Sequence, residues 1–159
     1  MSHIKKNLLY LIQAAIIAAI YVIITLTFSP LSFGPVQFRF SEALTVLPFV
    51  LKSAVPGLFV GCLIANFFSP NPLMWMDVVF GSLATLLAAY LTMKTKKPYL
   101  APLPPVIVNA LIIGIMLAYL YGLPLWLTIS SVGLGQAVSC YVLGYPLLFF
   151  LLKTKIFQR

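Results

Sequence analysis

The sequence predicts an all-α membrane protein with six transmembrane helices, on the basis of its composition, its apolar runs and its lysine distribution. Of the 159 residues, 62% are hydrophobic and 8% are charged, whereas a soluble domain is about half apolar and about a quarter charged. A soluble domain of this length still leaves about a third of its unfolded surface exposed, so this composition excludes a water-soluble globule. Almost every residue belongs to an apolar run or a short connection. We therefore expect residues 1–159 to form a single integral membrane domain.

Each apolar run can be compared with the thickness of a bilayer. A spanning helix needs about 20 mostly apolar residues, because each residue rises about 1.5 Å through a hydrocarbon core about 30 Å thick. The six predicted helices are Leu8–Phe28, Arg39–Leu51, Ala54–Phe68, Leu73–Met93, Pro104–Tyr121 and Pro124–Leu152.

The first three helices are separated by short breaks. The first begins after two lysines, as a secretory signal does, but its apolar run is longer than a signal core of about 7–15 residues, so we expect it to be retained. Ser29–Phe38 is a loop rich in Pro and Gly, and Pro48 is expected to bend the second helix. The second and third helices are short, so a re-entrant hairpin remains open for them.

The last three helices have clearer limits. The turn Ser69–Pro72 precedes the fourth helix, and a lysine cluster at residues 94–97 follows it. A pair of prolines opens the fifth helix and Gly122 closes it. The sixth is long enough to tilt, and Pro146 is expected to kink it.

The basic residues test this count independently. With six crossings, nine of the ten fall on one side of the membrane: Lys5, Lys6, Lys52, Lys94, Lys96, Lys97, Lys153, Lys155 and Arg159. The positive-inside rule assigns that side, and with it both termini, to the cytoplasm. The clusters are short and interrupted by apolar runs, so they do not form the continuous basic face of a nucleic-acid-binding protein.

Three charges depart from this pattern: Arg39, Glu42 and Asp77 all fall near the outer ends of predicted helices. Ionisable groups at membrane depth are costly and normally face a cavity or each other. A simpler interpretation pairs Arg39 with Glu42 three residues later, and leaves Asp77 to interact with its helix dipole. However, Glu42 and Asp77 are the only acids in the chain. Their similar depth favours one small polar pocket that binds a ligand.

Amide and aromatic side chains extend this candidate site. Asn66, Asn109 and Gln136 offer donors and acceptors in fixed geometry, which suits a flat heterocycle. Alternatively, they hold helices together, a contribution of about 0.6 kcal/mol each in membranes. Trp75 and Phe38 are placed near the outer interface, where most aromatics form a belt but some can stack on a planar ligand.

Several chemical signatures are missing from the sequence. There is no phosphate-binding loop, so any ATP chemistry must belong to another chain. His3 is the single histidine, and the two cysteines, Cys62 and Cys140, lie inside apolar runs without the spacing of a metal or disulfide framework. We therefore expect no metal, no cofactor and no enzymatic activity.

Three segments of the chain carry a resemblance to a known family: Val36–Pro48 (VQFRFSEALTVLP), Gly61–Asn66 (GCLIAN) and Asp77–Thr85 (DVVFGSLAT). They resemble segments of the QueT family, and this resemblance implies a substrate-binding S component of an energy-coupling factor (ECF) transporter. The resemblance covers essentially the whole chain. It implies a multi-pass protein of a prokaryotic cell membrane that binds a small base-like compound from outside. It also implies three partner subunits, namely the membrane scaffold EcfT and two ATPase subunits EcfA.

The resemblance further implies a substrate and a docking surface. The substrate would be a queuosine precursor, an aminomethyl-deazaguanine or a close relative. Alanines spaced four apart in the first helix dock many S components on the scaffold, and here they map onto Ala14, Ala15, Ala18 and Ala19. By spacing alone, these alanines could equally pack inside the protein.

In this interpretation each of the two acids contacts a different part of the ligand. A carboxylate can accept two adjacent donors of a guanine-type edge, and a second acid would meet the aminomethyl cation. Arg39 would orient Glu42 or contact the ligand carbonyl, and the loop around Gly34 would close over the site. Three alternatives remain open: an S component for another vitamin, a stand-alone ion-coupled carrier with an acid as its proton site, and a purely structural subunit.

Overall fold

The computed structural model describes residues 3–33, 38–71 and 74–154, and within these ranges it contains helices and turns but no strand. Gly34, Lys155 and Arg159, which entered the sequence predictions, lie outside the described residues. The elements are α1 (His3–Thr27), α2 (Ser29–Ser32), η1 (Phe40–Phe49), α3 (Ala54–Asn66), α4 (Met74–Met76), η2 (Asp77–Gly81), α5 (Ser82–Lys94), η3 (Pro98–Leu100), α6 (Leu103–Tyr121), α7 (Leu125–Ala137), η4 (Val138–Gly144) and α8 (Tyr145–Lys153).

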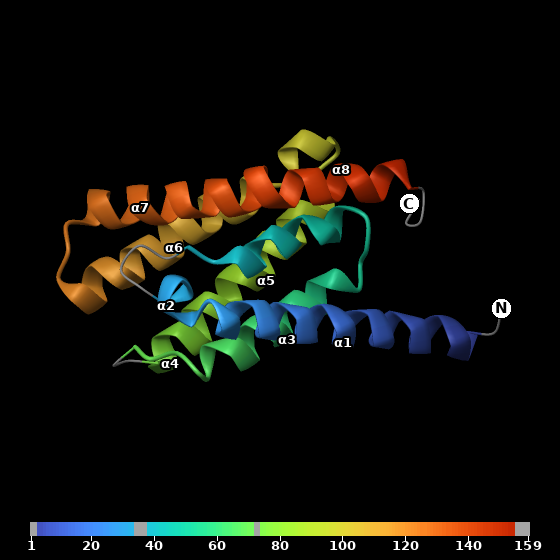
Figure 1. Ribbon diagram of the computed structural model, residues 1–159, viewed down its shortest axis with the longest axis horizontal. Coiled ribbons are helices and arrows are strands. Elements are labelled where there is room, and N and C mark those ends of the chain that lie inside the picture. The colour runs from blue at the N-terminus through green and yellow to red at the C-terminus, as the bar shows by residue number, and fades with distance from the viewer. Residues whose placement is uncertain (1–2, 34–37, 72–73, 155–159) are drawn as a thin grey trace.

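The long helices run side by side along the length of the molecule (Figure 1). Four helical stretches are long and apolar enough to cross a membrane: Ile4–Thr27, Met74–Lys94, Pro98–Tyr121 and Leu125–Lys153. The start of α1 and the end of α8 lie at the same end of this bundle (Figure 1). The predicted all-α class is therefore confirmed for the described residues, whereas four candidate membrane spans are found where six were predicted, so the count of six stays a prediction.

The second and third predicted helices are shorter than the other four. Residues Phe40–Phe49 form a 3-10 helix that contains Pro48, where a bent α-helix was expected. At a rise of about 2.0 Å per residue, η1 is about 20 Å long, and the 13 residues of α3 also cover about 20 Å. Both fall short of a hydrocarbon core of about 30 Å.

Two of the long stretches contain a π-helical segment. In the stretch from Met74 to Lys94 it is η2, which begins at Asp77. In the last stretch it is η4, which ends immediately before Tyr145. The irregularity in the last stretch was expected at Pro146, but it spans the seven residues Val138–Gly144, and Pro146 lies in the first turn of α8. Pro lacks an N–H, which is tolerated in a first turn.

The surface and the interior have the reverse of the usual polarity of a soluble protein. Large apolar side chains are widely exposed, including Ile23 (63%), Leu134 (69%) and Val142 (61%). In contrast, Arg39 and Glu42 are buried. A lipid solvent explains both features, because it favours apolar contacts outside and forces polar groups to find partners inside. The protein is a membrane protein.

Helices α1 and α3 pack closely through small residues. A Cβ atom on Gly57 would lie 2.7 Å from the backbone oxygen of Ala14, and one on Gly61 would lie 2.9 Å from that of Ala18. Helix α3 therefore covers Ala14 and Ala18, which were expected in the partner-docking surface. Ala15 and Ala19 lie about 100° further round α1, each next to a covered alanine, and are exposed. Only this second pair remains open to a partner.

Candidate functional site

The polar side chains singled out in the sequence collect inside the helix bundle. Six of them are at most 3% exposed, namely Arg39, Glu42, Asn66, Asp77, Asn109 and Gln136. They come from η1, its N-terminal flank, α3, η2, α6 and α7. Their contacts divide them into two groups, one around each acid.

Glu42 is held by a complete set of hydrogen bonds. The Tyr21 hydroxyl donates to its Oε1, and Nδ2 of Asn109 donates to its Oε2 at 3.2 Å. The Glu42 backbone oxygen accepts from Thr45 Oγ1 at 2.6 Å and from Cys140 Sγ at 3.5 Å. Both carboxylate oxygens thus have a protein partner without any ligand.

Asp77 is only half satisfied. Its Oδ2 accepts hydrogen bonds from Ser69 Oγ and from Asn71 Nδ2. Asn71 is oriented in turn by Tyr121, whose hydroxyl donates to Asn71 Oδ1 at 2.6 Å. The second carboxylate oxygen, Oδ1, is buried and has no partner among the described residues. This oxygen can accept a hydrogen bond from a ligand.

Arg39 does not form the ion pair with Glu42 that the simpler interpretation of the sequence proposed. Its Nε donates to the Ser32 backbone oxygen at 3.1 Å, and its guanidinium lies 5.0 Å from the centre of the Phe33 ring. Its Nη2 is buried without a partner in the described part of the chain. Arg39 nevertheless lies within electrostatic reach of both Glu42 and Asp77. The positive charge of the guanidinium therefore acts on both carboxylates, while its Nη2 has no hydrogen-bond partner among the described residues.

Cys62 joins Arg39 to the Asp77 group. Its sulfur lies 3.9 Å from Arg39 Nη1 and 3.3 Å from both Asn66 Nδ2 and Thr85 Oγ1. Asn66 Nδ2 also donates to the Asp77 backbone oxygen at 2.7 Å, whereas its Oδ1 is buried and unpartnered within the described ranges. The side chains connected in this way therefore have three polar atoms without a hydrogen-bond partner. One is a donor, Arg39 Nη2, and two are acceptors, Asn66 Oδ1 and Asp77 Oδ1.

The other predicted site residues are further from this open set. Cys140 Sγ contacts Gln136 Oε1 at 3.7 Å, so Gln136, like Asn109, belongs to the Glu42 group. Phe38 is half-buried and packs edge-on against Phe40 at 4.7 Å between ring centres. Trp75 is 55% exposed while the next residue, Met76, is buried, because successive residues on a helix point about 100° apart. The structure does not bring Trp75 into the polar centre.

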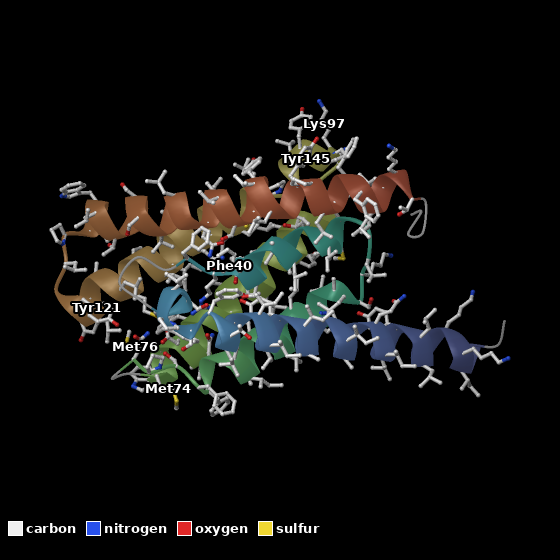
Figure 2. The ribbon with its side chains drawn as sticks, in the orientation of Figure 1. Phe40, Met74, Met76, Lys97, Tyr121 and Tyr145 are labelled. Carbon is white, nitrogen blue, oxygen red and sulfur yellow. The ribbon has the colours of Figure 1, made fainter. Side chains whose placement is uncertain are left out.

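Sequence reasoning missed the hydroxyl and amide partners of the two acids. Tyr21 lies in the middle of an apolar helix, where a buried tyrosine hydroxyl normally requires a hydrogen-bond partner. That signal could have marked Tyr21. Nothing comparable marked Asn71, which lies in the turn between α3 and α4, or Tyr121, the last residue of α6 (Figure 2), because polar groups are common at such positions. Cys62 was considered as a possible metal ligand or disulfide partner, whereas its contacts with Arg39 and Thr85 depend on how other segments pack against α3.

Irregular helical segments carry the chemistry of both groups. Glu42 lies in the 3-10 helix η1, Asp77 begins the π-helical η2, and Cys140 lies in the π-helical η4. Such segments are frequent at functional sites, because they re-aim side chains and free backbone groups. In η2, a Cβ on Gly81 would lie 2.7 Å from Asn66 Nδ2. The missing side chain at Gly81 is what allows Asn66 to approach.

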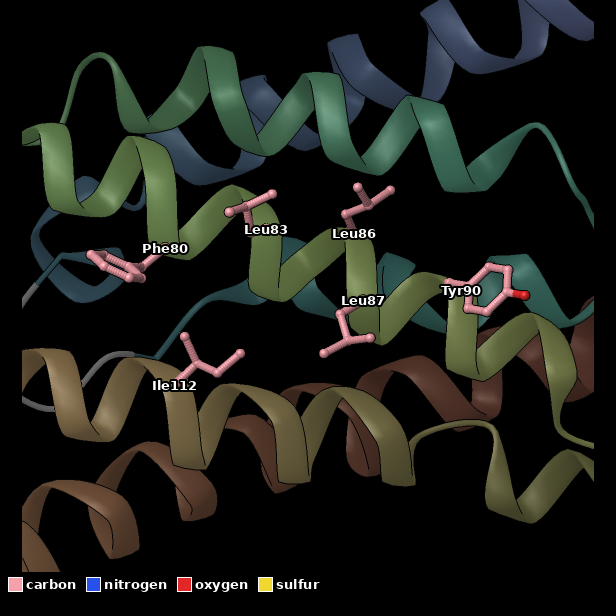
Figure 3. Close-up of a pocket in the computed structure, with 6 residues that line it drawn as sticks. All are labelled: Phe80, Leu83, Leu86, Leu87, Tyr90 and Ile112. Atoms are coloured by element: carbon pink, nitrogen blue, oxygen red, sulfur yellow. The ribbon is translucent and has the colours of Figure 1, made fainter.

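The surface grooves are chemically different from this polar centre. One groove of about 600 Å³ lies between α5 and α6 and is lined by Phe80, Leu83, Leu86, Leu87, Tyr90 and Ile112 (Figure 3). Apart from the Tyr90 hydroxyl, these side chains offer no hydrogen-bonding group. Among the described residues, no group of three or more His, Cys, Asp or Glu side chains is placed to hold a metal ion.

Comparisons with known proteins agree with the three sequence motifs. The family model described as QueT transporter matches residues 11–153. A curated relative, the queuosine precursor transporter QueT of Lactococcus lactis subsp. cremoris (strain MG1363), is 44% identical over 85 residues. That alignment covers 52% of this chain and 48% of the relative, about half of each. No solved structure matches the chain. With nine-tenths of its length matched by the family model, the chain belongs to the QueT family, whose members are transporters and not enzymes.

Proposed function

We propose that this chain is the substrate-specificity component of an ECF importer and binds a queuosine precursor, an aminomethyl-deazaguanine or a close relative. Family membership and the name of the curated relative support this substrate class. The observation that carries the proposal is a group of three buried, unpartnered atoms at this connected site: Arg39 Nη2, Asn66 Oδ1 and Asp77 Oδ1. One further buried side-chain atom of the described residues, Ser139 Oγ in η4, also has no partner. Buried polar groups are normally paired, so open ones at a connected site favour a ligand that pairs with them.

The hydrogen-bonding edge of a deazaguanine is complementary to these atoms. Its amine and ring N–H are neighbouring donors, which Asp77 Oδ1 and Asn66 Oδ1 would accept. Its carbonyl oxygen is an acceptor, to which Arg39 Nη2 would donate. Hydrogen bonds to ionised groups are roughly twice as strong as neutral ones, so Asp77 and Arg39 would contribute most of the selectivity.

The charge of the centre fits a cationic ligand. Arg39, Glu42 and Asp77 together carry a formal charge of −1, and an aminomethyl group carries +1, so the loaded site is neutral. Glu42 already has partners for both oxygens. We therefore assign it a positioning and charge-balancing role, whereas Asp77 contacts the ligand. An anionic vitamin would leave the site with a charge of −2, which a low-dielectric interior disfavours.

The transport cycle requires further subunits. We propose a single membrane domain with six crossings and both termini in the cytoplasm of a prokaryotic cell, in which η1 and α3 provide the two short crossings. The scaffold EcfT would contact α1, and two EcfA subunits would supply ATP hydrolysis. Since α3 covers Ala14 and Ala18, the scaffold would contact the exposed pair, Ala15 and Ala19.

Direct binding tests the substrate. The purified chain in detergent is titrated with aminomethyl-deazaguanine, its cyano analogue, guanine, thiamin, riboflavin and biotin, and heat of binding and thermal stabilisation are recorded. We expect the aminomethyl compound to bind most tightly and the cyano analogue, which lacks the cation, more weakly. Tighter binding of a vitamin would identify an S component of different specificity. No binding of any deazaguanine would contradict the proposal.

Co-expression and transport tests address the partners. We expect the chain to co-purify with a scaffold and ATPase subunits, and Ala15→Leu with Ala19→Leu to reduce the recovered complex while ligand binding persists. Ile23→Leu, an exposed change elsewhere on α1, is the matched control. Uptake by the isolated chain in proton-loaded vesicles, without ATPase subunits, would instead support an ion-coupled carrier.

A further inference from the structure

Three grooves follow one another along the α5–α6 boundary, outside the polar centre. The middle one is the groove of Figure 3, lined by residues including Phe80 and Ile112. The same two residues also line a neighbouring groove of about 520 Å³ that extends to Tyr119. A third groove, of about 360 Å³, lies between the same two helices at the opposite end of α5, where Lys94 contributes to its wall. The three grooves therefore form a row along the two helices, with Tyr90 of the middle groove next to Leu91 of the third, and we call this row the α5–α6 cleft.

The apolar part of the cleft has the length of one membrane leaflet. Eleven residue steps separate Leu83 from Lys94 on α5, which is about 16 Å of helix, and half of a hydrocarbon core is about 15 Å. Leu87 and Tyr90 line this stretch and are 44% and 48% exposed. An extended acyl chain has a similar length and chemistry.

The cleft ends at a cluster of unneutralised lysines. Lys94 lines the third groove, and Lys96 and Lys97 follow within three residues; all three are exposed. The nearest aromatic contacts of this cluster are Lys94 Nζ 5.2 Å from the centre of the Tyr90 ring, and Lys97 Nζ 5.7 Å from that of Tyr99. The chain has only two acidic residues, and both are buried in the polar centre. No side-chain carboxylate of this chain can therefore neutralise the cluster.

We propose that the α5–α6 cleft binds an anionic phospholipid. Its phosphate would contact Lys94 and Lys97, and one acyl chain would lie along Leu87 and Leu83 towards Phe80. Basic pockets between membrane helices favour anionic head groups for this electrostatic reason. The combination of an apolar cleft of leaflet length with a cationic end selects a lipid over a protein helix, which would bring no phosphate to the lysines. The inference is independent of the proposed substrate.

Lipid retention tests this site. The chain is purified in detergent with equal amounts of phosphatidylglycerol and phosphatidylcholine of identical acyl chains, and bound lipids are counted by native mass spectrometry. We expect about tenfold preferential retention of phosphatidylglycerol. The double variant Lys94→Gln/Lys97→Gln should lose this preference, whereas Lys153→Gln, which removes an exposed lysine at the end of α8, should keep it. Equal retention of both lipids, or an equal loss in the control, would overturn the proposal.

A second variant tests the acyl chain separately from the charge. Leu83→Trp fills the apolar cleft without changing any charge, and we expect it to lower phosphatidylglycerol retention several-fold. Glycerol 3-phosphate, which has the phosphate but no acyl chain, should not displace the bound lipid. Displacement by this soluble compound, or unchanged retention in Leu83→Trp, would show a simple phosphate site and contradict the lipid assignment. Gel filtration of every variant verifies that the protein remains folded.

Discussion

Glu42 and Asp77 are equally buried, at 1% exposure each, yet their surroundings differ in one decisive respect. The carboxylate of Glu42 has a partner for each oxygen, from α1 and α6. The carboxylate of Asp77 has two donors on one oxygen and none on the other. Burial alone therefore does not distinguish a structural acid from a ligand-binding acid. The two acids are distinguished by whether every carboxylate oxygen has a hydrogen-bond partner within the protein.

The physical reason lies in the cost of unpaired groups. A buried polar atom without a partner costs about 1–3 kcal/mol, and more if charged. The Glu42 group avoids this cost in the free protein, so its loss should mainly affect stability. The Asp77 group bears this cost until a ligand arrives, so its change should mainly affect affinity. Four predictions test this contrast, from the largest expected effect to the smallest.

Glu42→Ala should produce the largest loss of stability. The substitution leaves the Tyr21 hydroxyl and Asn109 Nδ2 buried without their acceptor, and breaking such a charged network costs about 3 kcal/mol or more. The free energy of unfolding in detergent, without ligand, measures it. An unchanged value would mean that the Glu42 group is not structural, and the contrast would fail.

Asp77→Asn should produce the largest loss of affinity. The remaining oxygen can still accept from Ser69 and Asn71, which places the new amide donor opposite the donors of the ligand. We expect about 100-fold weaker binding, or about 2.7 kcal/mol, with little change in unfolding. Glu42→Gln is the matched comparison and should weaken binding less. If titration ranks these two variants in the opposite order, the assigned roles are reversed.

Gly81→Ala should weaken binding by an intermediate amount. The added methyl group would lie 2.7 Å from Asn66 Nδ2 and displace it. Because one neutral hydrogen bond to the ligand is then misplaced, we expect about tenfold weaker binding. Gly133→Ala is the control, since its added methyl group meets only Ala110 Cβ, at 3.4 Å. Equal affinities of the two variants would remove Asn66 from the site.

Two tyrosine variants should differ in which property they change, and one of them, Tyr121→Phe, should give the smallest effect of all. Tyr121→Phe removes the donor that orients Asn71, and we expect about threefold weaker ligand binding at nearly constant stability. Tyr21→Phe removes a donor to Glu42 and should lower the unfolding free energy by about 1.5 kcal/mol with less effect on affinity. Calorimetric titration and unfolding of both variants separate the two outcomes. Identical profiles would contradict the division into two groups.

The membrane character and the helix limits were predictable from the sequence. The observed helix α6, Leu103–Tyr121, differs by one residue from the predicted Pro104–Tyr121. Helix α3 begins at the predicted Ala54 and ends two residues early. These features depend on local hydropathy and on Pro and Gly, which act within a few residues of their position. The three motifs likewise indicate the family whose model matches residues 11–153.

The type of helix in each segment, α, 3-10 or π, was harder to predict than its limits. Residues 40–49 have the composition of an apolar α-helix but form a 3-10 helix, and the segments from Asp77 and from Val138 form π-helix. Packing against several neighbouring helices decides between hydrogen-bonding patterns whose local energies are similar. Pro48 and Pro146 indicated irregularity in the correct helices, but its type and extent follow from those tertiary contacts.

The sequence alone determined that this is a helical membrane protein. It also determined that Arg39, Glu42 and Asp77 must be buried inside the protein and not face the lipid. Only the tertiary structure decided that Arg39 contacts Ser32 and Phe33 instead of Glu42, and that α3 covers just half of the alanines in α1. Apolar segments are recognisable locally, because their burial in lipid depends on their own composition. A hydrogen bond depends on which side chains approach within about 3 Å. For Glu42 and Asn109, 67 residues apart in the chain, the packing of whole helices sets that approach.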